Sequence, residues 1–289
     1  MNAEIPPAER SMLLNSSDHS RDSAGMRYVY PVVSRRAGGV SIGINLNPNN
    51  ACNWRCIYCQ VPNLTRGSAP EIDLALLEAE LRQMLRELLH GDFLTTRVPE
   101  GARRIEDIAF SGNGEPTSAK QFYPAVELVV RIVRELELAE SIKLRLITNG
   151  SLVDRPEVQR GLELLGQAKG EAWFKLDAGT RLGIKRLNGV DVEPAAVAGR
   201  LLECASRCTT WVQSCCFAVD GIAPSEAEIL AWLDLLGKVR TRLAGVHLYG
   251  LARPSLQTEA PRLGRLPREW LGKLGERVEQ MGLTAKISP

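Results

Sequence analysis

The fold is decided by the stretch Ser41-Ile-Gly-Ile-Asn-Leu-Asn47 and by the run Cys52-Asn-Trp-Arg-Cys56-Ile-Tyr-Cys59, which follows it after four residues. In the first stretch, apolar residues alternate with small or polar ones, so the two kinds of side chain face opposite sides of a strand. The same alternation recurs at 143–149, 172–178 and 244–250. Strands of a flat sheet that is covered on both faces would instead be apolar throughout. The pattern predicts an apolar face against helices and a polar face that lines an inner chamber; edge strands wetted by solvent are the alternative.

Strand-like runs alternate with runs at helical period along the middle of the chain. The strand-like runs lie at 41–47, 105–111, 143–149, 172–178, 210–219 and 244–250. The helical runs place apolar residues on one face, as Leu77, Leu81 and Leu88 do in the first of them. Consecutive β/α units imply parallel strands joined by right-handed crossovers. This order of elements predicts an α/β fold, an open or closed barrel of β/α units.

The composition excludes several classes of protein. The chain has 289 residues, of which 36 are basic and 34 acidic, and therefore a formal net charge of +2. Such a balance gives no general attraction to nucleic acids or to membranes. The apolar runs fall far short of the ~20 residues that span a bilayer, and the N-terminal apolar core, Met12-Leu13-Leu14, is too short for a signal peptide. We therefore expect a cytoplasmic protein with seven reduced cysteines.

The chain divides into three segments. Residues 1–25 are rich in Ser, Asp, Asn and Pro and lack periodicity, so we predict a flexible leader. Residues 26–251 hold the β/α units and are predicted to form one core domain. Residues 252–289 begin with a loop rich in proline and end in a helix near 267–281, which we expect to pack on the core.

The cysteine run follows the first predicted strand. Cys52, Cys56 and Cys59 lie within eight residues, so one loop can place all three around one metal centre. Iron–sulfur clusters take thiolate ligands from short runs of this kind. A structural zinc site prefers a fourth Cys or His, and the nearest histidines are His19 and His90. In β/α barrels, the loops that follow the strands form the active face.

The spacing Cys-x3-Cys-x-aromatic-Cys after a first strand resembles that of the radical S-adenosylmethionine (SAM) superfamily. The resemblance implies a partial (β/α)6 TIM-like barrel in which Cys52, Cys56 and Cys59 bind a 4Fe–4S cluster and SAM chelates the fourth iron. The reduced cluster of such enzymes cleaves S-adenosyl-L-methionine, and the resulting 5′-deoxyadenosyl radical takes hydrogen from a substrate, which the sequence leaves unidentified. A one-electron reductant such as a flavodoxin or ferredoxin is implied as a partner. Tyr58 lies where the family's aromatic residue contacts the adenine.

A second landmark is the turn Ser111-Gly-Asn-Gly-Glu-Pro116 at the end of the second predicted strand. It resembles the family's Gly-Gly-Glu-Pro element, whose backbone and carboxylate hold the methionyl amino group of SAM. Glycine suits a backbone that must approach a ligand closely. The resemblance therefore implies that Gly114 and Glu115 bind SAM, although Asn113 departs from the family's pattern.

Polar residues at later strand ends match the family less specifically. Asn149 ends the third predicted strand, and Lys175 and Asp177 end the fourth. By the resemblance, these three residues contact the ribose and the carboxylate of SAM. The alternative is that Lys175 and Asp177 form an ion pair that serves only itself.

Four further cysteines, Cys204, Cys208, Cys215 and Cys216, follow the cysteine run. The first two are four residues apart on a predicted helix and share a face, whereas Cys215 and Cys216 are adjacent in a strand and point to opposite sides. The parity of Gln213 makes Cys215 the inward residue of the pair. A second cluster and a reactive Cys215 are possible interpretations, and buried structural cysteines are the ordinary one.

Candidates for substrate contact gather at the inward positions of the last two strands. They are Gln213, Cys215, His247, Tyr249 and Arg253. The last three lie at the end of the sixth strand, where they could contact an anionic substrate or the carboxylate of SAM. The alternative for His247 is a hydrogen-bonded core residue.

The run Cys-Ile-Tyr-Cys with Ser-Gly-Asn-Gly-Glu-Pro-Thr resembles wybutosine-type tRNA-modifying enzymes and glycyl-radical activating enzymes. This analogy says little about the substrate. The rival from another class is a non-catalytic zinc-binding or nucleic-acid-binding module. The predicted polar chamber and the Gly-Glu-Pro turn favour the radical SAM enzyme.

Overall fold

The computed structural model describes residues 13–14, 24–34 and 38–289, so most of the predicted leader at 1–25 lies outside the described residues. The described residues form one principal sheet of eight strands, flanked by helices. Its strands in spatial order are β1 (Val29–Ser34), β2 (Gly39–Ile44), β5 (Ile105–Phe110), β6 (Lys143–Thr148), β7 (Glu171–Lys175), β8 (Thr209–Cys215), β10 (Gly245–Tyr249) and β12 (Ala285–Ser288).

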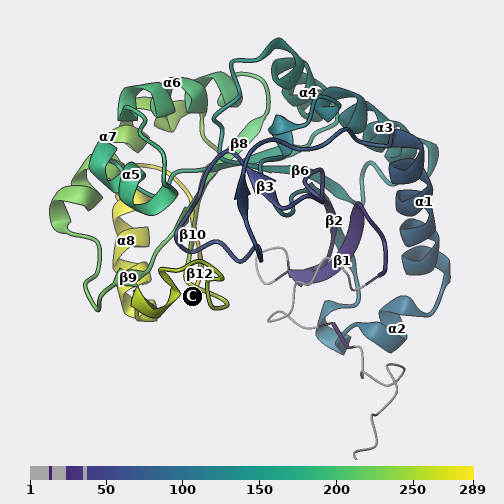
Figure 1. Ribbon diagram of the computed structural model, residues 1–289, viewed down its shortest axis with the longest axis horizontal. Coiled ribbons are helices and arrows are strands. Elements are labelled where there is room, and N and C mark those ends of the chain that lie inside the picture. The colour runs from purple at the N-terminus through teal and green to yellow at the C-terminus, as the bar shows by residue number, and fades with distance from the viewer. Residues whose placement is uncertain (1–12, 15–23, 35–37) are drawn as a thin grey trace, which may run out of the picture.

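The topology confirms the predicted partial barrel. The strands from β2 to β10 follow one another in sequence order and pair in parallel. The sheet curls, the helices stand around its convex side, and β1 and β12 form its two edges (Figure 1). The fold is therefore a half-barrel of six β/α units with one further strand at each edge.

Eight helices lie in the described part of the chain, and they follow the strands as predicted. They are α1 (Leu74–His90), α2 (Phe93–Arg97), α3 (Phe122–Glu135), α4 (Pro156–Gln167), α5 (Arg181–Asn188), α6 (Pro194–Ala205), α7 (Glu226–Val239) and α8 (Arg268–Gln280). In α1, Leu77, Leu81 and Leu88 are buried together, as their spacing predicts. The side chain of Asp73 begins this helix, because its carboxylate accepts a hydrogen bond from Leu76 N at 3.0 Å.

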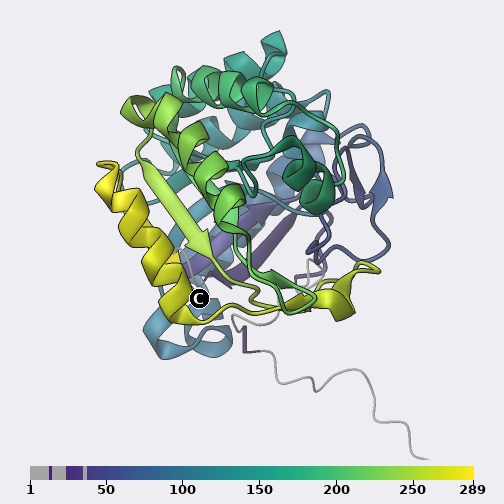
Figure 2. The same ribbon diagram turned by 90° about the vertical axis from the view of Figure 1, so that its left-hand side faces the viewer.

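Two strands and one strand boundary differ from the prediction. β1 pairs antiparallel with β2 and contains Pro31, which an edge strand tolerates. β12 pairs in parallel with β10 and follows the last helix in the sequence. That helix, α8, which is yellow in Figure 2, packs against both strands. The run 210–219 is not one strand: β8 ends at Cys215, and the short β9 (Ala218–Val219) pairs with β11 (Leu263–Gly264) instead. At the end of β8, Cys215 N donates a hydrogen bond to Asp177 Oδ1 at 3.0 Å.

The inward face of the half-barrel is polar, as the alternation of the strands predicts. Arg145 forms ion pairs with Asp107 and, at 3.4 Å, with Glu171. Next to this network, the ring of His247 lies between two indole rings. The distance between ring centroids is 4.4 Å to Trp173 and 4.8 Å to Trp211. These side chains fill the half-barrel below the strand ends, so the open space lies at the carboxyl ends of the strands.

No helix in the described ranges is both long and apolar enough to cross a membrane. Two short strand pairs complete the fold. One is the β9–β11 pair, and the other joins β3 (Ala51–Cys52) to β4 (Thr65–Arg66) beside the cysteine run. The second pair closes the base of the loop that carries the three cysteines.

Candidate active site

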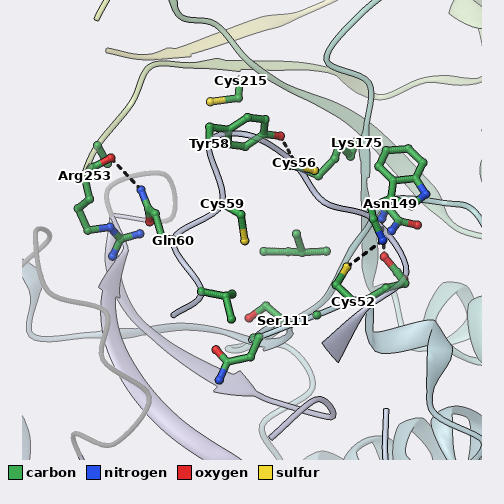
Figure 3. A pocket seen from close by; sticks show the side chains of 18 of the residues that line it. Cys52, Cys56, Tyr58, Cys59, Gln60, Ser111, Asn149, Lys175, Cys215 and Arg253 are labelled. Carbon is green, nitrogen blue, oxygen red and sulfur yellow. Dashed lines mark hydrogen bonds between the residues drawn. The ribbon is translucent and has the colours of Figure 1, made fainter. Parts of the chain in front are cut away.

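A cavity of about 310 Å³ opens at the carboxyl ends of the strands (Figure 3). Most of the residues predicted to bind cofactor or substrate line it: Cys52, Cys56, Tyr58, Cys59, Gly114, Glu115, Asn149, Lys175, Cys215, Tyr249 and Arg253. Its size falls at the lower end of ordinary ligand sites. The structure therefore brings together residues from six separate segments of the chain.

Three of the predicted site residues do not line this cavity. Asp177 lies behind Tyr58, on the wall of a neighbouring cavity of about 220 Å³. Gln213 is buried and donates a hydrogen bond to the carbonyl of Trp173 at 3.0 Å. His247 is stacked between two tryptophans deeper in the half-barrel. The last two face inward as predicted, but they stand below the chamber.

The cysteine loop, Cys52–Cys59, is held on one side by the end of α5. Ile57 N donates to the carbonyl of Leu187 at 2.9 Å, and Arg55 N donates to that of Asn188 at 3.1 Å. Gly189 ends the helix with φ 67°, a left-handed conformation that glycine adopts without strain. A Cβ at this position would lie 2.7 Å from the carbonyl oxygen of Arg55. The loop and the helix end are thus packed backbone against backbone.

A segment far along the chain holds the other side of the cysteine loop. Ser255 Oγ donates to the carbonyl of Ile57 at 2.7 Å, and Leu256 N donates to that of Cys59 at 2.9 Å. At the base of the loop, Gly67 N donates to the carbonyl of Cys52 at 3.0 Å. Because its backbone is bound on these sides, the loop can direct its thiols into the chamber.

The three thiols face a common space (Figure 3). Burial raises the pKa of Cys52 to about 11 and that of Cys56 to about 12. Within the described residues, no three His, Cys, Asp or Glu side chains are grouped to hold a single metal ion. A polynuclear cluster makes a different demand, because its thiolate ligands stand around the cluster and not around one atom. Three thiols on one cavity therefore fit an iron–sulfur cluster.

Tyr58 is part of a buried hydrogen-bonded network. Its hydroxyl donates to Asp177 Oδ2 at 2.5 Å and accepts from Lys175 Nζ at 2.5 Å, while Nζ lies 3.8 Å from the same carboxylate oxygen. Burial alone would lower the pKa of Lys175, but the attraction of Asp177 and its neighbours raises it well above the usual value. Lys175 and Asp177 therefore form an ion pair with the tyrosine hydroxyl inserted into it, while Lys175 also borders the cavity.

Glu115 is buried among hydrogen-bond donors. Its carboxylate accepts from Thr117 Oγ1 and Thr148 Oγ1, both at 2.7 Å, and from Asn149 N at 2.6 Å. Burial nevertheless raises the pKa of this carboxyl group. Glu115 thus joins the end of β5 to the end of β6 at the cavity wall. The neighbouring Gly114 leaves no room for a side chain, because a Cβ there would overlap the carbonyl oxygen of Ala51.

The remaining cysteines do not gather into a second site. Cys204 and Cys208 are buried in the core, where they contact Thr210 Oγ1 and the carbonyl of Gly170. Cys216 points into the main core, whereas Cys215 borders the cavity, as its inward parity predicts. All seven cysteines of the chain are free thiols.

Several residues of the site were not predicted from the sequence. Trp54, Gln60 and Ser111 line the cavity, and Gln60 Nε2 donates to the carbonyl of Arg253 at 3.2 Å (Figure 3). Asn188 donates a hydrogen bond to Cys56 Sγ at 3.3 Å. Trp54 and Gln60 lie within two residues of a predicted cysteine ligand, and this proximity is a local signal that could have identified these two residues.

No protein-family model matches the chain. A curated UPF0026 protein of Helicobacter pylori (strain J99) is 27% identical over 242 residues, which cover 81% of this chain and 68% of that protein. Its name assigns no activity.

Two solved structures share the fold. The radical SAM enzyme anSMEcpe with bound AdoMet and the Kp18Cys peptide superposes with a TM-score of 0.53 at 16% identity over 85% of this chain, and a tagged form of the same enzyme with bound AdoMet gives 0.51 at 16% identity over 86%. The chain spans 63% of the length of anSMEcpe. This chain therefore shares the partial-barrel fold of these radical SAM enzymes, as the predicted architecture implies.

Proposed function

We propose that this chain is a radical SAM enzyme in which Cys52, Cys56 and Cys59 hold a 4Fe–4S cluster and the adjoining chamber binds S-adenosyl-L-methionine. One observation carries the proposal: the three thiols and the Gly114-Glu115 turn line a single cavity at the carboxyl ends of parallel strands. These strand ends form the active face of β/α barrels. The rival, a mononuclear zinc site, would need a fourth Cys or His ligand beside the loop.

The cluster, once reduced by a donor such as a flavodoxin or ferredoxin, would supply the electron that cleaves SAM to a 5′-deoxyadenosyl radical. The residues of this chain fix where that happens. The cysteine loop is bound through its backbone to α5 and to the segment around Ser255, and these contacts would hold the thiols toward the cluster. Such preorganisation limits the reorganisation that accompanies reaction.

Charge at the cavity wall supports a SAM site. Lys175 keeps its positive charge because its pKa is raised by Asp177 and other neighbours, and its ammonium group can attract the carboxylate of SAM. Asn149 lies beside it, with its amide held by a hydrogen bond to Asn53 Oδ1 at 2.9 Å. We assign these two side chains and the backbone at Gly114 to SAM. Tyr58 contributes its ring to the wall while its hydroxyl remains bound to Asp177.

We place the substrate at the opposite wall of the same cavity. Tyr249 and Arg253 line this wall at the end of β10, and Cys215 adjoins them at the end of β8. The guanidinium group of Arg253 suits an anionic substrate, because it can form paired hydrogen bonds with a carboxylate or phosphate.

The test is anaerobic reconstitution with iron and sulfide, followed by addition of dithionite and SAM and quantification of 5′-deoxyadenosine. We expect the wild-type chain to form this nucleoside and the Cys56→Ala variant to form none. Cys204→Ala is the matched control, since it removes a thiol that is buried in the core, and we expect it to retain the reaction. A colourless, zinc-loaded wild-type protein that leaves SAM intact would overturn the proposal.

A further inference from the structure

Asn188 is a buried amide that joins the cysteine loop to the acidic end of β7. It is the last residue of α5 and is 2% exposed. Its Nδ2 donates one hydrogen bond to Cys56 Sγ at 3.3 Å and another to Asp177 Oδ2 at 2.7 Å. We propose that Asn188 is a positioning residue that raises the reduction potential of the cluster through its hydrogen bond to the Cys56 sulfur. This inference rests on the proposed function, because it concerns the same cluster.

The orientation of the amide follows from its two neighbours. A carboxylate is an acceptor only, and a thiolate ligand is likewise an acceptor. Asp177 and Cys56 therefore both need a donor, which the amide nitrogen of Asn188 supplies. The flipped amide would place its oxygen against two negative groups. Asp177 is itself held in place, because it also accepts from the hydroxyl of Tyr58 at 2.5 Å and from Cys215 N at 3.0 Å. The donor is thus fixed at the sulfur.

The backbone fixes the height of this donor relative to the loop. The carbonyls of Leu187 and Asn188 accept from Ile57 N and Arg55 N, the two amides that flank Cys56. Thr180 caps the start of α5, because its side chain accepts from Gly183 N at 2.9 Å, and the left-handed Gly189 follows the last residue of the helix. Rotation of the last turn away from Cys56 would break the two backbone bonds to the loop and both side-chain bonds of Asn188.

The physical effect on a cluster has a definite sign. Hydrogen bonds to the sulfurs are among the features that set the potential of an iron–sulfur centre. Reduction adds negative charge to the cluster and its ligands, so a donor at the sulfur stabilises the reduced form more than the oxidised form. Removal of the donor should therefore make the cluster harder to reduce. If the bond strengthens on reduction by about the worth of an ordinary hydrogen bond, the ratio of reduced to oxidised cluster at a fixed potential changes roughly five-fold.

The experiment compares the reconstituted wild-type chain with Asn188→Ala and with Leu187→Ala. The second variant is the matched control, because it removes packing from the adjacent residue of the same helix turn and leaves the donor in place. Iron and sulfide are counted first, and the reduced fraction is then followed by visible absorption in an anaerobic redox titration without SAM. We expect full iron in all three chains and a midpoint potential shifted to more negative values in Asn188→Ala alone.

The outcomes separate this inference from the proposed function. An unchanged midpoint in an iron-replete Asn188→Ala variant would overturn the inference alone, and so would an equal shift in Leu187→Ala. If Asn188→Ala binds less iron, Asn188→Leu is measured instead, since it fills the volume and lacks a donor. Loss of iron in both variants would show that Asn188 holds the loop and does not set the potential. A wild-type chain that takes up no iron would overturn the proposed function and this inference together.

Discussion

The seven cysteines of this chain lie in two regions that differ in burial and in what their side chains contact. The cysteine loop carries Cys52, Cys56 and Cys59, which are partly buried and line one cavity. We call Cys204, Cys208, Cys215 and Cys216 the second cysteine group; all four are buried, on or next to α6 and β8. In the loop, the backbone is bound to neighbouring segments and the sulfurs face open space. In the second group, three of the four sulfurs contact the core.

Thiols with a raised pKa occur in both regions. The pKa of Cys56 in the loop and the pKa of Cys204 and Cys216 in the second group are all raised to about 12, and burial is the main cause in each. Burial thus suppresses ionisation of Cys56, Cys204 and Cys216 alike. Geometry makes the difference, because only the loop gathers its sulfurs around a space that a cluster could fill.

Replacement of each cysteine in turn by alanine tests this comparison most directly. We expect Cys52→Ala, Cys56→Ala and Cys59→Ala each to abolish the iron content of the reconstituted chain, since three ligands from one loop leave none to spare. The four variants of the second cysteine group should keep their iron, and those in the core should lose roughly 1–2 kcal/mol of unfolding free energy. The measurements are iron and sulfide counted per chain and denaturant unfolding.

One result would reverse the comparison. Iron loss in Cys204→Ala or Cys208→Ala, with the fold intact by circular dichroism, would mean that the second group binds a cluster of its own. Iron retained in Cys56→Ala would remove the loop from the site altogether.

The glycines near the two regions give the next largest effect. A Cβ at Gly114 would overlap the carbonyl of Ala51 beside the cysteine loop, whereas a Cβ at Gly199 on α6 would meet nothing within 4 Å. We expect Gly114→Ala to lower the unfolding free energy by about 2–3 kcal/mol through overpacking. Gly199→Ala should raise it by roughly 0.5–1 kcal/mol, because alanine is the better helix former. Thermal unfolding measures the difference in midpoint between the two variants. Equal midpoints would show that the backbone near Ala51 can move to accommodate a Cβ at position 114.

The sequence predicts the architecture well because the architecture depends on local periodicity. Period-two alternation and helical faces recur along the chain, and they place the six parallel strands and the apolar face of α1. The prediction that Cys204 and Cys208 share one helix was wrong, because α6 ends at Ala205. The edge strands β1 and β12 escape this reasoning: Pro31 interrupts the first, and the second is four residues long. The end of β8 was not predicted either. Cys215 N donates there to Asp177, which lies 38 residues earlier in the sequence, so no local pattern marks this contact.

The candidate site was predicted only in part, because some of its features depend on contacts between distant segments. Alternation gives the face on which a side chain lies, so Gln213 and His247 do point inward. It does not give the height along the half-barrel, and both residues lie below the cavity. Contacts between distant segments could not be predicted from local patterns either. Asn188, for example, donates a hydrogen bond to Cys56, which lies 132 residues earlier in the sequence. The three cysteines could be predicted because a single loop carries them.

The smallest effect concerns the segment that holds the cysteine loop from outside. Ser255 is 6% exposed, and its hydroxyl donates to the carbonyl of Ile57 at 2.7 Å and accepts from Gln257 N at 3.0 Å. Ser255→Ala removes these two bonds and a third, 3.2 Å to the carbonyl of Cys59, without touching a thiol. We therefore expect the loop to lose about 1 kcal/mol of stability. Because the loss is local to the loop, iron should pass to an external chelator roughly five-fold faster, the rate change that corresponds to this free energy.

Ser206→Ala is the control for this change, because it removes a similar hydroxyl bond, 2.8 Å to the carbonyl of Glu203, at the end of the helix that carries Cys204. A serine beside the second cysteine group should leave the rate of iron release unchanged, since no cluster depends on that backbone. Equal rates in Ser255→Ala and the wild type would mean that the cluster itself fixes the loop once bound. The backbone contacts of the loop would then matter for assembly of the site and not for its retention.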